Sequence, residues 1–120
     1  MKKIIYQYKG VLQRVVDGDT LDVTIDMGFA ITTRQRIRLA KVDTAEIFRV
    51  PKASEAYQEG IKAKEYVEKR LQENPDGFII ETLKQPGKYG RYIGEIFLPD
   101  SDISLNDELL QKGLAKKWPH

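Results

Sequence analysis

The stretch Leu21-Asp22-Val23-Thr24-Ile25-Asp26-Met27 alternates strictly between apolar and polar side chains. In an extended chain successive side chains point to opposite faces, so the apolar residues of this stretch all fall on one face. This pattern is typical of a half-buried β-strand, and it is the clearest strand in the sequence. The rest of the fold is predicted outward from it.

Two further strands are expected on either side of this stretch. Residues 4–16 are rich in β-branched and aromatic side chains, and the pair Asp17-Gly18 predicts a tight turn that joins them to the central strand as a hairpin. Gly28 marks a second turn, after which residues 31–39 alternate again. On this third strand Ile37 and Leu39 share one face, and the other face carries Arg34, Arg36 and Arg38. The three strands predict a meander.

The pattern changes to a helical one over residues 54–74, where small and apolar side chains recur at three- and four-residue steps. Ser54 is the expected N-cap, and Asn74-Pro75-Asp76-Gly77 is expected to end the helix. Residues 78–83 and 92–98 then predict a second hairpin around Pro86-Gly87. A short helix over 105–112 is expected to close at Gly113 in a left-handed conformation.

Three strands, a helix, two strands and a terminal helix predict a small α+β, mainly β fold. A five-stranded barrel with a helix between strands three and four is the OB-fold arrangement, and barrel closure removes exposed strand edges. At 120 residues we expect one domain covering 1–120. Such a fold does not by itself establish a function.

The composition limits the chemistry. The chain has no cysteine and its single histidine is His120, which excludes a disulfide scaffold, a cysteine-based zinc site and a histidine-centred triad. Any bound ion is therefore expected to be a hard cation held by oxygen atoms. The net charge is only +2, yet residues 34–52 carry six basic residues against two acidic ones. This block indicates either an anionic partner or an ordinary solvated strand face.

The sequence also suggests where the protein works. No apolar run approaches the roughly 20 residues of a membrane span, and the first residues show no apolar segment of a secretion signal. We expect no membrane association, a cytoplasmic location by default and a monomer. A processed, secreted form fits the same sequence.

Four fragments carry candidate chemistry, and each also has an ordinary structural interpretation. The first is a hairpin turn with two carboxylates, the second a strand with arginines, the third a capped turn, and the fourth the flank of a hairpin. In order they are Asp17-Gly18-Asp19-Thr20, Arg36-Ile37-Arg38-Leu39, Val42-Asp43-Thr44-Ala45-Glu46 and Lys88-Tyr89-Gly90-Arg91-Tyr92.

Taken together, the four fragments fit the hydrolysis of a phosphodiester, in which negative charge builds up around phosphorus. Asp19 and Asp43 are expected to hold a hard divalent cation, and Glu46 to act as the general base for an attacking water. Arg38 and Arg91 supply the forked, permanently charged donors that match a phosphate.

With these fragments, the sequence resembles the staphylococcal-nuclease-like (thermonuclease) family. The resemblance covers about residues 9–117 and places the motifs in family order. They are Val16-Asp17-Gly18-Asp19-Thr20, Arg38-Leu39, Val42-Asp43-Thr44-Ala45-Glu46, Lys88-Tyr89-Gly90-Arg91, Asn106-Asp107-Glu108-Leu109-Leu110 and Gly113-Leu114-Ala115.

The resemblance implies an OB barrel and calcium-dependent (Ca2+) hydrolysis of DNA and RNA. It implies that calcium is held by the carboxylates of Asp19 and Asp43 and by the backbone carbonyl of Thr44. Glu46 then activates or orients the water, and Arg38 and Arg91 clamp the phosphate.

Three other positions bear on the resemblance. Lys88 and Tyr89 match positions that contact the nucleotide phosphate, and Trp118 falls close to a position whose aromatic ring stacks on the nucleotide. Ala45 stands where the family usually has proline, so the turn before Glu46 lacks a constraint on φ.

A different class of function fits the same fold. An OB module without catalysis binds single strands through basic grooves and through base stacking on side chains such as Tyr89, Tyr92 and Trp118. Loss of catalysis usually removes a carboxylate or an arginine, and none is missing here. The nuclease interpretation is therefore preferred over the binding module.

Overall fold

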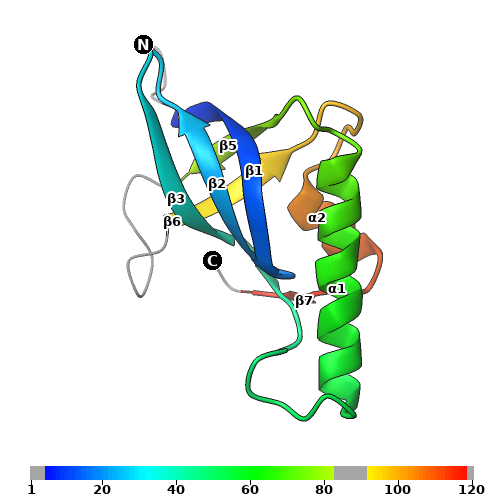
Figure 1. The fold of residues 1–120 in the computed structure, drawn as a ribbon. Helices are drawn as coiled ribbons and strands as arrows, with labels where there is room; N and C mark the ends of the chain where they lie inside the picture. The colour runs from blue at the N-terminus through cyan, green and yellow to red at the C-terminus, as the bar shows by residue number, and fades with distance from the viewer. Residues whose placement is uncertain (1–4, 83–91, 119–120) are drawn as a thin grey trace.

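The computed structural model describes residues 5–82 and 92–118, which form seven strands and two helices (Figure 1). In chain order the elements are β1 (Gln7–Asp17), β2 (Thr20–Asp26), β3 (Thr32–Leu39), β4 (Val42–Asp43), α1 (Glu55–Gln72), β5 (Phe78–Thr82), β6 (Tyr92–Phe97), α2 (Leu105–Gln111) and β7 (Lys116–Lys117). The predicted strands and helices are all present, and their ends differ from the predicted ones by at most three residues.

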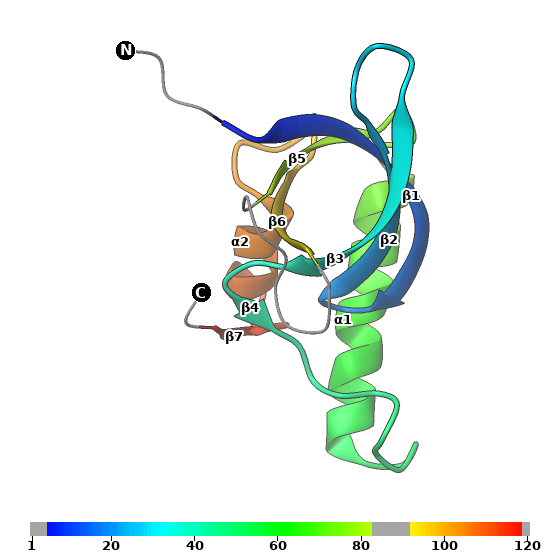
Figure 2. The same ribbon diagram turned by 90° about the vertical axis from the view of Figure 1, so that its left-hand side faces the viewer.

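Five of these strands close into a barrel in the order β1-β2-β3-β6-β5, a ring that Figure 2 shows end on. β1 closes the ring because its residues 9–17 pair with β2 while its residues 7–10 pair with β5. β3 and β6 run parallel, with Ile37 opposite Tyr92 and Leu39 opposite Gly94. The remaining neighbours are antiparallel. The predicted five-stranded OB-like α+β fold is thus confirmed.

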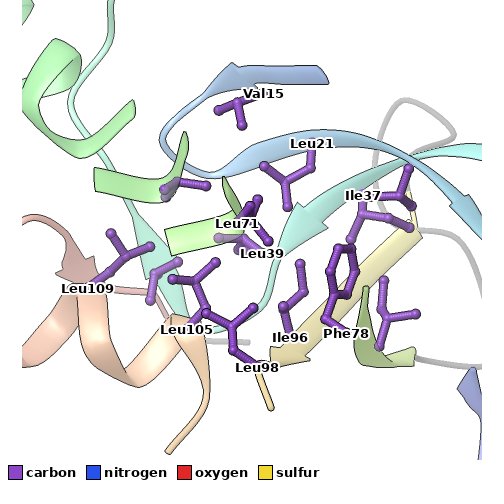
Figure 3. Close-up of a cluster of buried hydrophobic side chains, with 14 of the residues drawn as sticks. Val15, Leu21, Ile37, Leu39, Leu71, Phe78, Ile96, Leu98, Leu105 and Leu109 are labelled. Carbon is purple, nitrogen blue, oxygen red and sulfur yellow. The ribbon is translucent and has the colours of Figure 1, made fainter. Parts of the chain in front are cut away.

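The barrel interior is filled by the apolar sides of the alternating strands (Figure 3). Leu21 and Val23 are fully buried, as the pattern of β2 predicts, and Ile37 and Leu39 enter the same core from β3. Burying each such side chain stabilises the fold by about 1.5–3 kcal/mol, before the chain entropy is subtracted.

α1 and α2 lie beside each other at one end of the barrel, to the right of the strands in Figure 1 and behind the ring in Figure 2, and both contribute buried side chains to the core. Ser54 is the N-cap of α1, as predicted, and its hydroxyl accepts a hydrogen bond from the Tyr57 amide. α2 is capped in the same way by Ser104, and Gly113 follows it with a φ of 70°. Neither helix among the described residues combines the length and the apolar character that crossing a bilayer requires.

Asn106 of α2 forms hydrogen bonds with the barrel near the end of the β3–β6 pairing. Its side-chain oxygen accepts from the Ile96 amide at 3.1 Å, and its side-chain nitrogen donates to the carbonyls of Ala40 and Gly94 at 2.8 and 3.2 Å. The residue is fully buried. It therefore supplies a hydrogen-bond partner to the Ile96 amide and the Ala40 carbonyl, and a second donor to the Gly94 carbonyl, which also accepts from the Ala40 amide.

One element of the structure was not predicted. β4 and β7 pair with each other as a short antiparallel ribbon, with Val42 opposite Lys117 and Asp43 opposite Lys116. Two-residue strands are too short to show an alternating pattern. The antiparallel pairing of β5 with β6 confirms the second predicted hairpin, whereas its turn around Pro86-Gly87 lies outside the described residues.

Candidate active site

The turn between β1 and β2 is pressed against α1 and against the segment after β4. The Asp19 amide donates to Asp17 Oδ1 at 3.1 Å, which fixes the turn locally. A β-carbon on Gly18 would sit 2.8 Å from the Ala63 β-carbon and 2.9 Å from Thr44 Oγ1. Only glycine allows this approach, and the approach brings Asp19 beside Thr44.

Asp19 is buried, and both of its carboxylate oxygens accept hydrogen bonds. Oδ1 accepts from the Thr20 hydroxyl at 3.0 Å, and Oδ2 accepts from the Thr44 amide at 3.1 Å. Burial opposes the charge, but the hydrogen bond with Asp17, the charge of Arg38 and the Thr44 amide together hold the pKa of Asp19 below its ordinary value. Asp19 is therefore an anion at neutral pH.

Asp17 has the opposite behaviour. Burial, together with the hydrogen bond and the negative charge of Asp19, raises the pKa of Asp17 to about 7. Two neighbouring carboxyls do not both ionise easily, so the proton resides on Asp17 and the charge on Asp19. This difference within one turn was not anticipated from the sequence, because the motif itself does not show which carboxyl is buried against which partner.

Arg38, on β3, joins the two predicted metal-binding carboxylates. Its Nη1 lies 3.4 Å from Asp19 Oδ2, and its Nη2 lies 3.4 Å from Asp43 Oδ1. Nη1 also donates to the backbone carbonyls of Leu39 and Val42 at 3.1 and 2.8 Å. The Arg38 side chain is only 12% exposed. A cation held by backbone carbonyls thus lies between two carboxylates.

The C-terminal residues support this cluster. The Trp118 amide donates to the Lys41 carbonyl at 2.7 Å, and the β4–β7 ribbon aligns the chain next to Asp43. The guanidinium carbon of Arg38 lies 5.7 Å from the centre of the Trp118 ring, within the range of a cation–π contact. The structure therefore relates Trp118 to Arg38, a contact that the sequence did not reveal.

Glu46 lies in the exposed segment between β4 and α1, and its Oε1 accepts a hydrogen bond from the Phe48 amide at 2.8 Å. It lines an open hollow together with residues of the β1–β2 turn, including Asp17 and Thr20. Asp43 and Thr44 line another hollow, which is walled by α1 and residues 113–116. The structure thus gathers Asp19, Arg38, Asp43 and Thr44, while Glu46 lines a separate hollow with Asp17 and Thr20.

The remaining predicted site residues, Lys88, Tyr89 and Arg91, lie outside the described residues. Their roles remain predictions from the sequence. The predicted cation site has two described carboxylates, and within residues 5–82 and 92–118 no group of three or more His, Cys, Asp or Glu side chains converges as a metal site.

Comparison with known proteins gives a family match. The model of the family described as staphylococcal nuclease homologues matches residues 36–119. The matched range includes Arg38, Asp43, Thr44 and Glu46, and it begins after the turn that holds Asp19. This match confirms the resemblance predicted from the ordered motifs.

Two curated proteins are similar over nearly the whole chain. Uncharacterized protein MJ1439 of Methanocaldococcus jannaschii is 35% identical over 129 aligned residues, which cover 92% of this chain and 59% of that protein. Endonuclease YhcR of Bacillus subtilis is 29% identical over 119 residues, which cover 94% of this chain and 9% of that protein. Nearly all of this chain therefore aligns with each relative, but it spans only part of each relative's length.

Proposed function

The chain belongs to the family of staphylococcal nuclease homologues, and from this premise we propose that it is a calcium-dependent nuclease that hydrolyses phosphodiester bonds of DNA, RNA or both. The observation that carries the proposal is the position of Arg38 between Asp19 and Asp43. In such a cluster, a negatively charged phosphate of the substrate is able to bind to the guanidinium of Arg38. The endonuclease named among the relatives supports the same reaction class.

The donor set fits calcium. Asp19 and Asp43 offer carboxylate oxygens and Thr44 a backbone carbonyl, and hard cations prefer oxygen ligands of this kind. Because the protein supplies so few side chains, we propose that water completes the coordination. Bound there, calcium offsets the negative charge of the phosphate and makes a nearby water more acidic.

In the proposed reaction, Glu46 accepts a proton from a water whose oxygen attacks phosphorus, and the bond from phosphorus to the leaving oxygen breaks. Arg38 stabilises the charge on the phosphoryl oxygens. Its 3.4 Å separations from the carboxylates exceed the 2.7–2.9 Å of a strong charge-assisted bond. We therefore propose that Arg38 Nη2 exchanges its contact with Asp43 for a phosphate oxygen with little loss of free energy.

Arg91 is proposed as the second phosphate clamp, and Lys88 and Tyr89 as contacts to the nucleotide. These three assignments depend on the motif alone. One domain, a monomer and a cytoplasmic location also remain predictions.

The test is to incubate purified protein with DNA or RNA, in the presence of calcium or of a chelator. Cleavage is expected only with calcium. Glu46→Gln is expected to lower the rate by roughly 10²–10⁴-fold, since a general base contributes about that much. Glu65→Gln is the matched control, because Glu65 is an exposed glutamate of α1. Arg91→Ala is expected to lower the rate as well.

Two outcomes would overturn the proposal. Undiminished cleavage by both Glu46→Gln and Arg91→Ala contradicts the assigned roles. Binding of nucleic acid that is sensitive to salt, indifferent to calcium and without any product identifies the chain as the binding module instead.

A further inference from the structure

The hollow that contains Glu46 has features that the proposed reaction does not use. It measures about 490 Å³ and lies between the β1–β2 turn, β3 and the segment after Glu46. Besides Glu46, the residues that line it include Asp17, Thr20, Arg36, Phe48 and Arg49. An aromatic ring and two guanidinium groups thus surround the position of the proposed general base.

Phe48 is an apolar residue of this hollow whose side chain is left in solvent. It is 63% exposed, although burying such a ring stabilises a fold by about 1.5–3 kcal/mol. Its backbone amide donates to Glu46 Oε1 at 2.8 Å. This hydrogen bond holds the Glu46 carboxylate beside the Phe48 backbone, and both residues line the same hollow. A planar group stacked on Phe48 would lie beside Glu46.

The two arginines of the hollow differ in availability. Arg36 makes a bidentate ion pair with Asp22, with distances of 2.8 and 3.1 Å. Arg49 is exposed, and with the described residues it forms no hydrogen bond or ion pair. An exposed guanidinium next to an exposed aromatic ring matches the two parts of a nucleotide, a phosphate and a base.

We propose that Phe48 and Arg49 form a nucleotide subsite beside Glu46, in which a base of a single-stranded nucleic acid stacks on Phe48 while a neighbouring phosphate contacts Arg49. This inference rests on the proposed nuclease function. A base stacked on Phe48 is withdrawn from pairing, so the subsite favours single strands over a duplex.

A single exposed phenylalanine is common on protein surfaces, so the experiment needs a matched control. Phe29 provides one, since it is 97% exposed on the turn between β2 and β3. In Figures 1 and 2 that turn and the segment between β4 and α1 lie at opposite ends of the molecule.

The test measures binding rather than cleavage. A fluorescently labelled oligothymidine is titrated with the full chain in chelator, and anisotropy reports the dissociation constant. Phe48→Ala is expected to weaken binding roughly tenfold, because stacking of one base on an aromatic ring has about that effect. Phe48→Trp is expected to retain the affinity, and Phe29→Ala to match the unaltered protein. An oligomer of abasic spacers is expected to bind the Phe48→Ala variant and the unaltered protein equally.

Arg49→Ala reports on the phosphate contact. It is expected to reduce the slope of log affinity against log salt by about 0.7, the contribution of one phosphate contact on a single strand. Unchanged oligothymidine affinity in Phe48→Ala overturns the subsite, as does an equal loss of affinity for the abasic oligomer.

These results are separable from the proposed function. Cleavage by the unaltered protein combined with Phe48-independent binding refutes the subsite and leaves the nuclease. Phe48-dependent binding without cleavage in calcium supports the subsite and refutes the nuclease.

Discussion

Gly60 of α1 lies directly against Ala45: a β-carbon at position 60 would sit 2.6 Å from the Ala45 carbonyl oxygen and would also overlap the side chain of Ile47. Ala45 and Ile47 flank Glu46 in the sequence. The helix therefore supports the segment that presents the proposed general base. This contact supplies a constraint where Ala45 replaces the proline typical of the family.

We predict that Gly60→Ala lowers both stability and nuclease activity. Helix propensity alone predicts that the change stabilises the protein by about 1 kcal/mol. The overlap with a backbone carbonyl predicts the opposite sign, because backbone gives way less easily than a flexible side chain. A displacement of about 1 Å at Glu46 is expected to lower kcat by up to roughly 10²-fold.

Urea unfolding and steady-state kinetics check this prediction. Substrate affinity is expected to change less than kcat, since the displaced group acts on the proton of the water. Glu65→Ala, at an exposed position of the same helix, is the control. A Gly60→Ala variant that is more stable and fully active would show that the contact is not restrictive.

Asn106 is predicted to be essential for stability rather than for chemistry. Asn106→Leu keeps a similar volume but removes the Asn106 partner of the Ile96 amide and of the Ala40 carbonyl, while the Gly94 carbonyl still accepts from the Ala40 amide. An unsatisfied buried backbone group costs about 1–3 kcal/mol, so we expect a loss of about 2–4 kcal/mol in the free energy of unfolding. Urea denaturation measures it. Asp107→Asn, a change in the same helix, should cost far less.

The ion pairs of Arg70 are expected to make the free energy of unfolding depend on pH in the acid range. Its guanidinium binds Glu108 at 2.8 Å and Asp100 at 2.6 Å. The hydrogen bond from Arg70 is the main cause that lowers the pKa of Asp100 to about 2. Burial opposes the charge of Glu108, but hydrogen bonds from Arg70 and Tyr66 still hold the pKa of Glu108 below its ordinary value.

Since both carboxyls are more acidic when folded, they contribute stability above their ordinary pKa values and lose it in acid. For Asp100 the contribution is lost as the pH falls from about 4 towards about 2, and for Glu108 it is lost below the ordinary range of a glutamate. We therefore expect the free energy of unfolding to fall over this interval. In Arg70→Met the fall should be shallower, because the carboxyls lose the partner that lowers their pKa values. Unfolding curves at several pH values compare the slopes, and parallel slopes would contradict this assignment.

Most of the fold was predictable from the sequence because it depends on patterns that extend over several residues. The alternation in β2 and β3 and the spacing of apolar positions along α1 each indicate one buried face. The β4–β7 ribbon was not predictable, since its four residues show no period. Only the folded chain places Lys117 opposite Val42.

The sequence predicted which residues belong to the candidate site better than it predicted the contacts between them. Asp19, Arg38 and Asp43 are indicated by residue type and motif, and the structure gathers them. The contact of Trp118 with Arg38 depends on the fold, because the residues are distant in the chain. The support of Glu46 through Gly60 depends equally on the packing of α1.

The position of Arg38 leads to a prediction about calcium. In the proposed site, Arg38 and calcium would compete for the carboxylates of Asp19 and Asp43, each of which lies 3.4 Å from the guanidinium. Arg38→Ala removes the competitor and leaves the Val42 carbonyl without its donor. In chelator we expect this variant to be less stable by about 2 kcal/mol. In calcium we expect it to gain more stability than the unaltered protein does, because the two carboxylates then bind the ion more tightly.

Thermal unfolding in calcium and in chelator measures both effects without reference to activity. Arg36→Ala is the matched control, since Arg36 lies on the same strand but binds Asp22. It is expected to keep the calcium-induced shift of the unaltered protein. Asp43→Asn is expected to lose most of the shift, because it removes one of the two proposed carboxylate ligands. If Arg38→Ala gains no more from calcium than the control does, Arg38 does not compete with the ion. If Asp43→Asn keeps the full shift, the ion does not bind at Asp43, and the ion pairs of Arg38 serve the fold alone.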